Sequence, residues 1–148
     1  MAGRAPGEPR RRGGGGPDPA AGPGGGAVKT RRNELPAYVT RDGSEVRELM
    51  HPARHDVRRQ SLAEAVVPPG MRTHLHRHRI TEELYHVTAG AGVMTLGTDR
   101  FEVLPGDTVL IPPGTPHCVE ATGGEALVIL CACSPAYSHE DTELLDGT

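Results

Sequence analysis

The stretch Gly70–Gly90, GMRTHLHRHRITEELYHVTAG, decides how the rest of the chain is interpreted. It contains two histidines separated by one residue, His76 and His78, and a carboxylate, Glu83, five residues further on. Residues i and i+2 of a strand point to the same face, so the two imidazoles project together. Glu83 has the wrong parity for one continuous strand. We therefore expect a bend over Arg79–Glu82 and a new strand that starts at Glu83.

A second stretch, Gly106–His117 (GDTVLIPPGTPH), supplies a further imidazole after a Pro-Pro-Gly turn. The three imidazoles of His76, His78 and His117, with the carboxylate of Glu83, form a ligand set suited to a transition metal. Ring nitrogens bind such an ion at about 2.0–2.1 Å, so rings on separate strands can hold the same ion. The sequence therefore predicts one divalent metal ion per chain, with Fe, Mn, Ni, Zn and Cu left open.

The two stretches resemble the two motifs of the cupin superfamily. Gly70, His76, His78, Glu83 and Gly90 match the first motif, G-x5-H-x-H-x4-E-x6-G, and Gly106, Pro112, Gly114 and His117 match the second, G-x5-P-x-G-x2-H-x3-N. The departure is Ala121, where the family often has Asn. The resemblance covers roughly residues 61–133 and implies a small, single-domain cupin barrel whose matched His and Glu side chains bind metal.

Gly and Pro turns divide the chain after Arg31 into short strands. The predicted strands are Glu45–Met50, Ser61–Val67, Arg72–His78, Glu83–Ala89, Gly92–Leu96, Arg100–Leu104, Thr108–Ile111, His117–Ala121 and Ala126–Cys133. The last of these is apolar throughout, so we expect both of its faces to be buried. Such spacing indicates an all-β sandwich or barrel, and the resemblance makes it a double-stranded β-helix, the jelly roll. A short helix is expected over Glu140–Leu145, capped by Ser138.

The first 30 residues differ in kind from the remaining 118. Half of them are Gly or Pro, and Arg10–Arg12 is followed by four glycines. Such a segment buries too little apolar surface to offset its ordering entropy, so we predict a disordered tail, 1–30, before a single domain, 31–148. The tail holds five of the 16 basic and two of the 19 acidic residues, which leaves the domain a net charge of −6. An acidic domain is a poor nucleic-acid binder.

The cysteines and the hydropathy indicate the cellular compartment of the protein. Cys131 and Cys133 are two residues apart in an apolar strand, so they share a face and are not expected to form a disulfide. Buried free thiols fit a reducing cytoplasm. No apolar run approaches the 18 or so residues of a membrane helix, and no apolar stretch follows the arginines as in a secretory signal. We therefore expect a cytoplasmic protein without membrane contact.

Strand parity nominates three further residues for the site, as catalytic candidates. Arg72 and His74 share the face of His76 and His78 if that strand is regular, and Tyr85 shares the face of Glu83. Arg72 could hold an anionic substrate or face solvent. His74 could move a proton or only orient a ligand by a hydrogen bond, and Tyr85 could orient substrate or form the pocket wall. The remaining histidines, predicted to be at the surface, are His51, His55, His86 and His139.

Three kinds of function remain open at this point. The first is a metal-dependent enzyme acting on a small organic molecule, most plausibly a mononuclear Fe(II) or Mn(II) dioxygenase. The second is a metal-dependent isomerase or cyclase that uses Zn(II) or Ni(II) as a Lewis acid, and the third is a non-catalytic barrel that binds a small ligand. The resemblance also implies a homodimer, for which Glu34–Met50 is the predicted contact.

Overall fold

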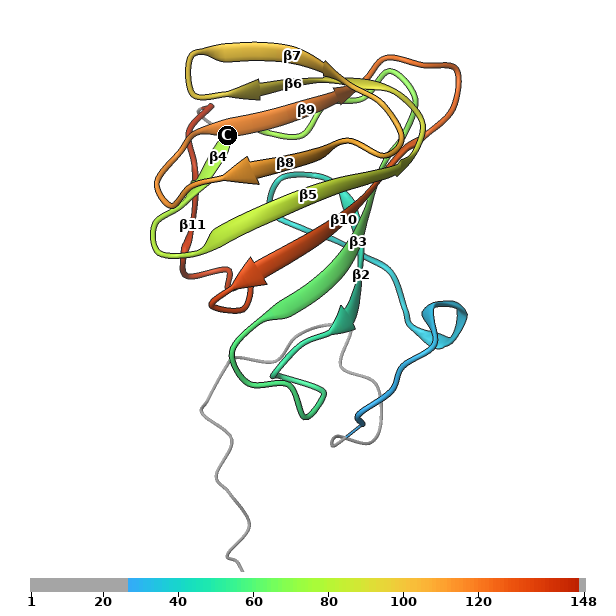
Figure 1. Cartoon of the computed structure of the whole chain (residues 1–148), viewed down its shortest axis with the longest axis vertical. Helices are drawn as coiled ribbons and strands as arrows, with labels where there is room; N and C mark the ends of the chain where they lie inside the picture. The colour runs from blue at the N-terminus through green and yellow to red at the C-terminus, as the bar shows by residue number, and fades with distance from the viewer. Residues whose placement is uncertain (1–26, 147–148) are drawn as a thin grey trace, which may run out of the picture.

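The computed structural model describes residues 27–146, which form two antiparallel sheets that enclose one core (Figure 1). One sheet has the strand order β1-β2-β3-β10-β5-β8 and the other the order β11-β4-β9-β6-β7. The strands are β1 Tyr38–Val39, β2 Glu45–Met50, β3 Ser61–Val67, β4 His76–His78, β5 Glu82–Ala89, β6 Gly92–Leu96, β7 Asp99–Val103, β8 Thr108–Ile111, β9 His117–Ala121, β10 Leu127–Ser134 and β11 Thr142–Leu144. The predicted all-β jelly roll is confirmed.

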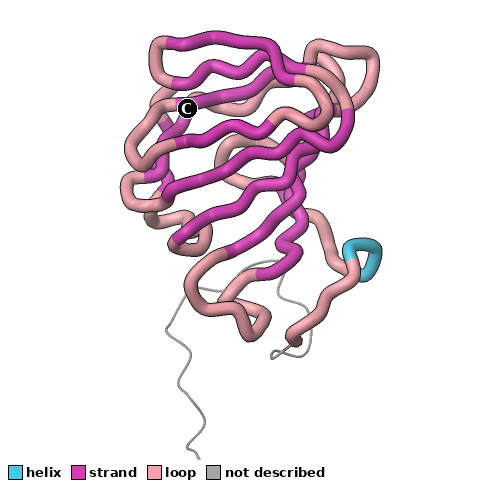
Figure 2. Tube along the Cα trace, in the orientation of Figure 1, coloured by secondary structure: helices cyan, strands magenta, loops and turns pink. Residues whose placement is uncertain are grey.

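Helix plays almost no part in the described chain. Its one helical element is the 3-10 turn η1, Arg32–Glu34, and loops connect the strands elsewhere (Figure 2). Within residues 27–146 there is no helix with the length and apolar character needed to cross a bilayer.

The core lies between the two sheets and follows the alternation of the strands. Along β10 every second residue is buried, and Leu127 and Ile129 are 0% and 2% exposed. They belong to the same cluster as Met94 of β6 and Val119 of β9 in the other sheet. Burying a side chain of this size stabilises the fold by about 1.5–3 kcal/mol. The intervening residues of β10 are half-buried, so the prediction that both of its faces are buried was wrong.

Two glycines of the motif stretches set turns that the barrel needs. Gly90, between β5 and β6, has φ +79°, and an added Cβ would lie 2.3 Å from the carbonyl oxygen of Ala126. Gly114 has φ +78°, and its N–H donates to the carbonyl oxygen of His78 at 2.6 Å. The second turn is therefore attached directly to β4, and the chain after Gly114 enters β9 beside it.

The predicted strands agree with the structure except near residue 72. Five have the predicted bounds and three are shifted by one residue at one or both ends, but the predicted Arg72–His78 is a strand only over His76–His78. Its first half pairs with several partners in turn. Arg72 forms an isolated bridge with Glu120, and the N–H of His74 donates to the carbonyl oxygen of Asp42. This interruption breaks the regular alternation that the parity argument assumed.

The C-terminal segment is a strand, so the predicted helix over Glu140–Leu145 was wrong. β11 pairs antiparallel with β4, with Thr142 opposite His78 and Leu144 opposite His76. The carboxylate of Asp141 accepts hydrogen bonds from the N–H groups of Ile80 and Thr81. These contacts with the exposed edge of β4 outweigh the local helix-capping tendency of Ser138.

The predicted tail falls mostly outside the described residues, because the structure describes the chain from Ala27 on. The expectation of disorder for residues 1–26 is therefore a prediction still. Two of the last four residues of that predicted segment, Ala27 and Thr30, contact the domain. The carbonyl oxygen of Ala27 accepts from the N–H of Asp56 at 3.1 Å, and the hydroxyl of Thr30 donates to the carbonyl oxygen of Leu49 at 2.6 Å.

Candidate metal centre

Two neighbouring strands bring the three motif histidines together inside the barrel. His76 and His78 occupy alternate positions of β4, and His117 is the first residue of β9, paired directly with His76. One ring nitrogen from each histidine lies within 4.8 Å of the others, and all three side chains are buried. The predicted convergence of His76, His78 and His117 is therefore present, and such a group could hold a metal ion.

Hydrogen bonds determine which ring nitrogen of each histidine is free. Nδ1 of His76 bonds the carbonyl oxygen of His74 at 2.8 Å, and Nδ1 of His117 bonds that of Thr115 at 2.9 Å. A carbonyl oxygen only accepts, so each Nδ1 carries the proton and each Nε2 keeps its lone pair. The lone pairs of both rings are thus available to a metal ion.

A hydroxyl group places the proton of His78 on Nδ1 as well. Its Nδ1 lies 3.0 Å from Oγ1 of Thr142, whose own hydrogen is donated to the carbonyl oxygen of Ser138 at 2.9 Å. The hydroxyl must then accept from Nδ1 of His78, so in the neutral ring Nε2 keeps its lone pair. Burial and the nearby His117 also lower the pKa of His76 to about 4, so this ring is neutral at neutral pH. All three imidazoles therefore have the form that binds metals.

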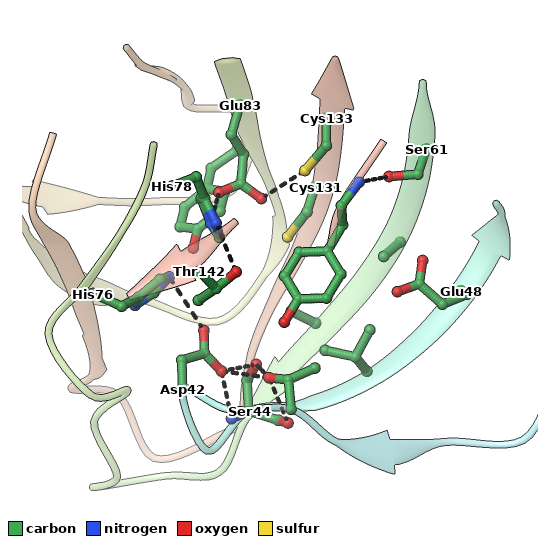
Figure 3. Close-up of a pocket in the computed structure, with 16 residues that line it drawn as sticks. Asp42, Ser44, Glu48, Ser61, His76, His78, Glu83, Cys131, Cys133 and Thr142 are labelled. Atoms are coloured by element: carbon green, nitrogen blue, oxygen red, sulfur yellow. Dashed lines mark hydrogen bonds and ion pairs between the residues drawn. The ribbon is translucent and has the colours of Figure 1, made fainter. Parts of the chain in front are cut away.

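Glu83 lies beside this group, with its carboxylate next to His78 in Figure 3 and close to His117 as well. Its Oε1 is 3.3 Å from Nε2 of His78 and 3.6 Å from Nε2 of His117, while Oε2 accepts the thiol hydrogen of Cys133 at 3.1 Å. Burial raises the pKa of the Glu83 carboxyl, but in the metal-free protein the His117 and His78 imidazoles, when they carry a proton on Nε2, more than offset this and lower it to about 2. The group is thus a carboxylate at neutral pH.

The unpaired atoms of the site test whether its residues fit a cation. Oε1 of Glu83 and Nε2 of His117 are both buried and have no hydrogen-bond partner. Buried polar atoms are almost always paired, and here an acceptor oxygen faces ring nitrogens that also carry lone pairs. A positive ion between them would satisfy every one of these atoms. The donor set therefore fits a divalent metal, with Glu83 approaching two of the three histidines rather than all three.

Asp42 adds a second carboxylate that the sequence did not reveal. It lies in the turn between β1 and β2, and its Oδ2 is 3.7 Å from Nε2 of His76. Its Oδ1 accepts from the hydroxyls of Thr40 and Ser44, each at 2.6 Å, and from the N–H of Ser44 at 2.9 Å. In sequence Asp42-Gly43-Ser44 is an ordinary turn signal, and nothing local relates it to the histidines.

The site opens into a pocket with about 500 Å³ of empty space, including its open mouth. The lining residues are Thr40, Asp42, Ser44, Val46, Glu48, Ser61, Ala63, Ala65, His76, His78, Glu83, Tyr85, Cys131, Cys133, Tyr137 and Thr142. Tyr85 lines the pocket, as strand parity predicted, with its ring edge-on to His117. Glu48, Cys131, Cys133, Tyr137 and Thr142 come from segments outside the motifs or from positions that were not singled out for the site.

The other two catalytic candidates lie elsewhere. Arg72 is exposed, and neither it nor His74 is among the lining residues. Nδ1 of His74 instead lies 3.3 Å from the carboxylate of Asp146. The prediction that both share the pocket face of His76 and His78 was wrong, because the strand begins only at His76.

Of the histidines predicted to be at the surface, His55 is an exception. It is 8% exposed, and its Nδ1 accepts the N–H of His51 at 2.9 Å. His86 is half-buried, and its Nδ1 bonds Oγ1 of Thr108. Within residues 27–146, no histidine other than the three motif residues belongs to the metal-binding group.

The fold and this three-histidine centre define a cupin, and comparison with known families agrees. Residues 63–133 match the model of the family described as Cupin domain. Protein SchB of Streptomyces halstedii is 34% identical over 113 residues, which are 73% of this chain and 82% of that protein. The chain therefore belongs to the cupin family.

Two further relatives extend this likeness. Uncharacterized protein MJ1618 of Methanocaldococcus jannaschii is 50% identical over 119 residues, which are 80% of this chain and 95% of that protein. Among solved structures, an oxalate decarboxylase is similar with a TM-score of 0.67 and 25% identity, over 84% of this chain and 34% of that chain. The similarity thus extends well beyond the two motifs, and the fold also occurs in an enzyme.

Proposed function

We propose that the protein is a mononuclear metal-dependent enzyme that acts on a small organic molecule in the barrel pocket, with dioxygenase-type chemistry as the leading reaction. The observation that carries the proposal is the convergence of three buried imidazoles whose Nδ1 hydrogen bonds leave every Nε2 free. Imidazole is the ligand that Fe, Ni, Cu and Zn sites share. The unpaired Oε1 of Glu83 adds the negative charge that such a cation needs.

In this proposal His76, His78 and His117 would hold the ion, together with Glu83. A bound divalent ion supplies Lewis-acid polarisation, and iron or manganese supplies one-electron chemistry as well. Burial raises the pKa of the Tyr85 phenol well above its usual value, so the phenol stays protonated and can donate a hydrogen bond to a substrate oxygen. The apolar wall of β3, formed by Ala63 and Ala65, limits water beside the reacting group.

A second candidate is a metal-dependent isomerase or cyclase, and Asp42 favours it. Its Oδ1 is held by three hydrogen bonds, while Oδ2 is turned toward His76 and the pocket. A carboxylate fixed in this way could accept a proton from a bound substrate, which is the step that isomerisation and cyclisation require. Such a reaction consumes no oxygen.

Metal analysis is the first test, on protein purified without a histidine tag. We expect about one divalent ion per chain, and preparations of wild-type protein that bind none would refute the proposal. Oxygen uptake with candidate diols and enols then tests the leading reaction, with His117→Ala as the inactive control. Conversion under argon would instead support the isomerase or cyclase, and a tight ligand recovered unchanged would support a binding barrel.

A further inference from the structure

The charges that line the pocket are all of one sign. Three carboxylates line it, those of Asp42, Glu48 and Glu83, and none of the described lining residues is Lys or Arg. Asp42 and Glu83 lie on either side of the two labelled histidines, His76 and His78 (Figure 3). A substrate that reaches the metal centre must therefore pass close to both carboxylates.

The arginines near this region are engaged outside the pocket. Arg77 and Arg79 both pair with Glu143 of β11, at 2.9 Å and 3.5 Å. Arg41, next to Asp42 in the sequence, donates to the carbonyl oxygen of His139 at 3.2 Å in an exposed position. These contacts leave no guanidinium among the lining groups to bind a phosphate or carboxylate.

A bound divalent ion does not reverse this balance. Its two positive charges would only offset those of Asp42 and Glu83, and no Lys or Arg among the described lining residues adds a further positive charge. Even with the ion bound, the lining thus offers no excess of positive charge to hold a negatively charged group.

The remaining polar groups can make hydrogen bonds with neutral ligands. Ser61 and Tyr137 line the same space as the carboxylates, and each hydroxyl makes a hydrogen bond, Ser61 with the N–H of Tyr137 and Tyr137 with Nδ1 of His139. Hydroxyl groups both donate and accept, whereas carboxylates only accept, so the pocket offers more acceptors than donors. A ligand rich in O–H or N–H donors fits such a wall better than one that ends in an anionic group.

We propose that the substrate is a neutral or cationic molecule bearing hydroxyl or amine groups, with no phosphate or carboxylate tail beyond the group that meets the metal. This inference rests on the proposed function and narrows its substrate class. The pocket would exclude sugar phosphates and other anionic metabolites by charge rather than by size.

Three probes with the same metal-chelating diol and different tails test this inference. Catechol has no tail charge, dopamine carries a cationic amine, and 3,4-dihydroxybenzoate carries a carboxylate. Dissociation constants are measured by calorimetry on the full-length Zn(II)-loaded protein under argon. We expect dopamine to bind on the order of tenfold tighter than 3,4-dihydroxybenzoate, or more, with catechol between them, because each tail charge interacts with nearby carboxylates in a medium less polar than water.

A matched pair of variants assigns the effect to the pocket. Asp42→Asn keeps an oxygen acceptor for Thr40 and Ser44 while it removes the charge, so we expect the ratio of the two dissociation constants to shrink several-fold. Glu125→Gln removes one charge in the exposed turn before β10 and should leave the ratio unchanged. An equal change in both variants would contradict a role for the pocket carboxylate.

The outcomes distinguish this inference from the proposed function. If 3,4-dihydroxybenzoate binds as tightly as dopamine, or if none of the three binds, the inference is overturned even though metal is bound. If the protein takes up no metal, the proposed function fails. The series is then measured on the metal-free protein, where dopamine must still bind tighter than 3,4-dihydroxybenzoate for the inference to stand.

Discussion

Metal binding should stabilise the fold, and replacing His117 with Ala should abolish most of that stabilisation. The ligand nitrogens come from β4 and β9, so an ion held by them also holds these strands together. An unfolded chain has no such preformed site, so the ion binds mainly the folded state. The quantity to measure is the rise in melting temperature between chelator-treated and metal-loaded protein, for each variant separately.

The expected magnitude follows from mass action. At a free metal concentration 100 times Kd, binding stabilises the folded state by about 2.7 kcal/mol. For a chain of this size each kcal/mol shifts the melting temperature by roughly 3–4 °C, which gives a rise of roughly 10 °C for the wild type. Losing an outer hydrogen-bond partner lowers metal affinity by up to roughly 100-fold, and losing a direct ligand such as His117 should cost at least as much. With a roughly 100-fold weaker affinity, the rise in melting temperature of His117→Ala falls to about 1–2 °C.

His86→Ala provides the matched control. His86 lies on β5 with its ring bonded to Thr108, outside the three-histidine group, so its variant should keep the full rise. Glu83→Gln should retain part of the rise, because three imidazoles supply most of the bonding. A full rise in His117→Ala, or its loss in His86→Ala, would refute the assignment of the ligands.

Three shorter predictions concern the thiol, the pH and the oligomer. Cys133→Ala should weaken Zn(II) binding in a titration more than Cys133→Ser does, because only serine keeps a donor for the Glu83 carboxylate. The free energy of unfolding of the metal-free protein should fall as the pH drops from about 6.5 to 4, because the folded-state pKa of His76 lies below its unfolded value. It should fall again from about 4.5 to 2, because the folded-state pKa of Glu83 is also lowered. Equilibrium denaturation that showed no loss of stability over these ranges would contradict this. Sedimentation should show a dimer that Val39→Glu dissociates, with Leu84→Glu, an exposed residue outside the predicted contact, as the control; a wild-type monomer of 15.7 kDa would count against the dimer.

The metal site was predictable because both of its determinants are local. His76 and His78 share a face by strand alternation, and Gly114 marks the turn that brings His117 beside them. Alternating patterns and turn residues likewise located most strands, since each element is encoded within a few residues. Arg72 was misplaced for a related reason. Parity holds only inside a regular ladder, and the chain before His76 pairs first with β9, at Glu120, and then with the β1–β2 turn, at Asp42.

The remaining pocket residues depend on contacts between segments far apart in the chain. Thr142 supports His78 from 64 residues away, and Cys133 supports Glu83 from 50 residues away. Ser138 suggested a helix cap locally, yet pairing with β4 made Thr142–Leu144 a strand. Asp42 is equally inconspicuous in its turn. No local pattern identifies such residues, because their positions follow from the closed barrel.

This division between local and distant determinants bears on what decides the reaction. The residues that would bind an ion lie in the two motif stretches, which a cupin with a different reaction could share. Apart from Tyr85, the residues that would contact a substrate beyond the ion lie outside those stretches, with Asp42 in the β1–β2 turn and Tyr137 before β11. Substituting Asp42 should therefore change which ligand binds and leave metal binding in place, whereas substituting His117 should remove both. If both substitutions had the same effect on metal and ligand, the division of roles between the motifs and the flanking segments would be wrong.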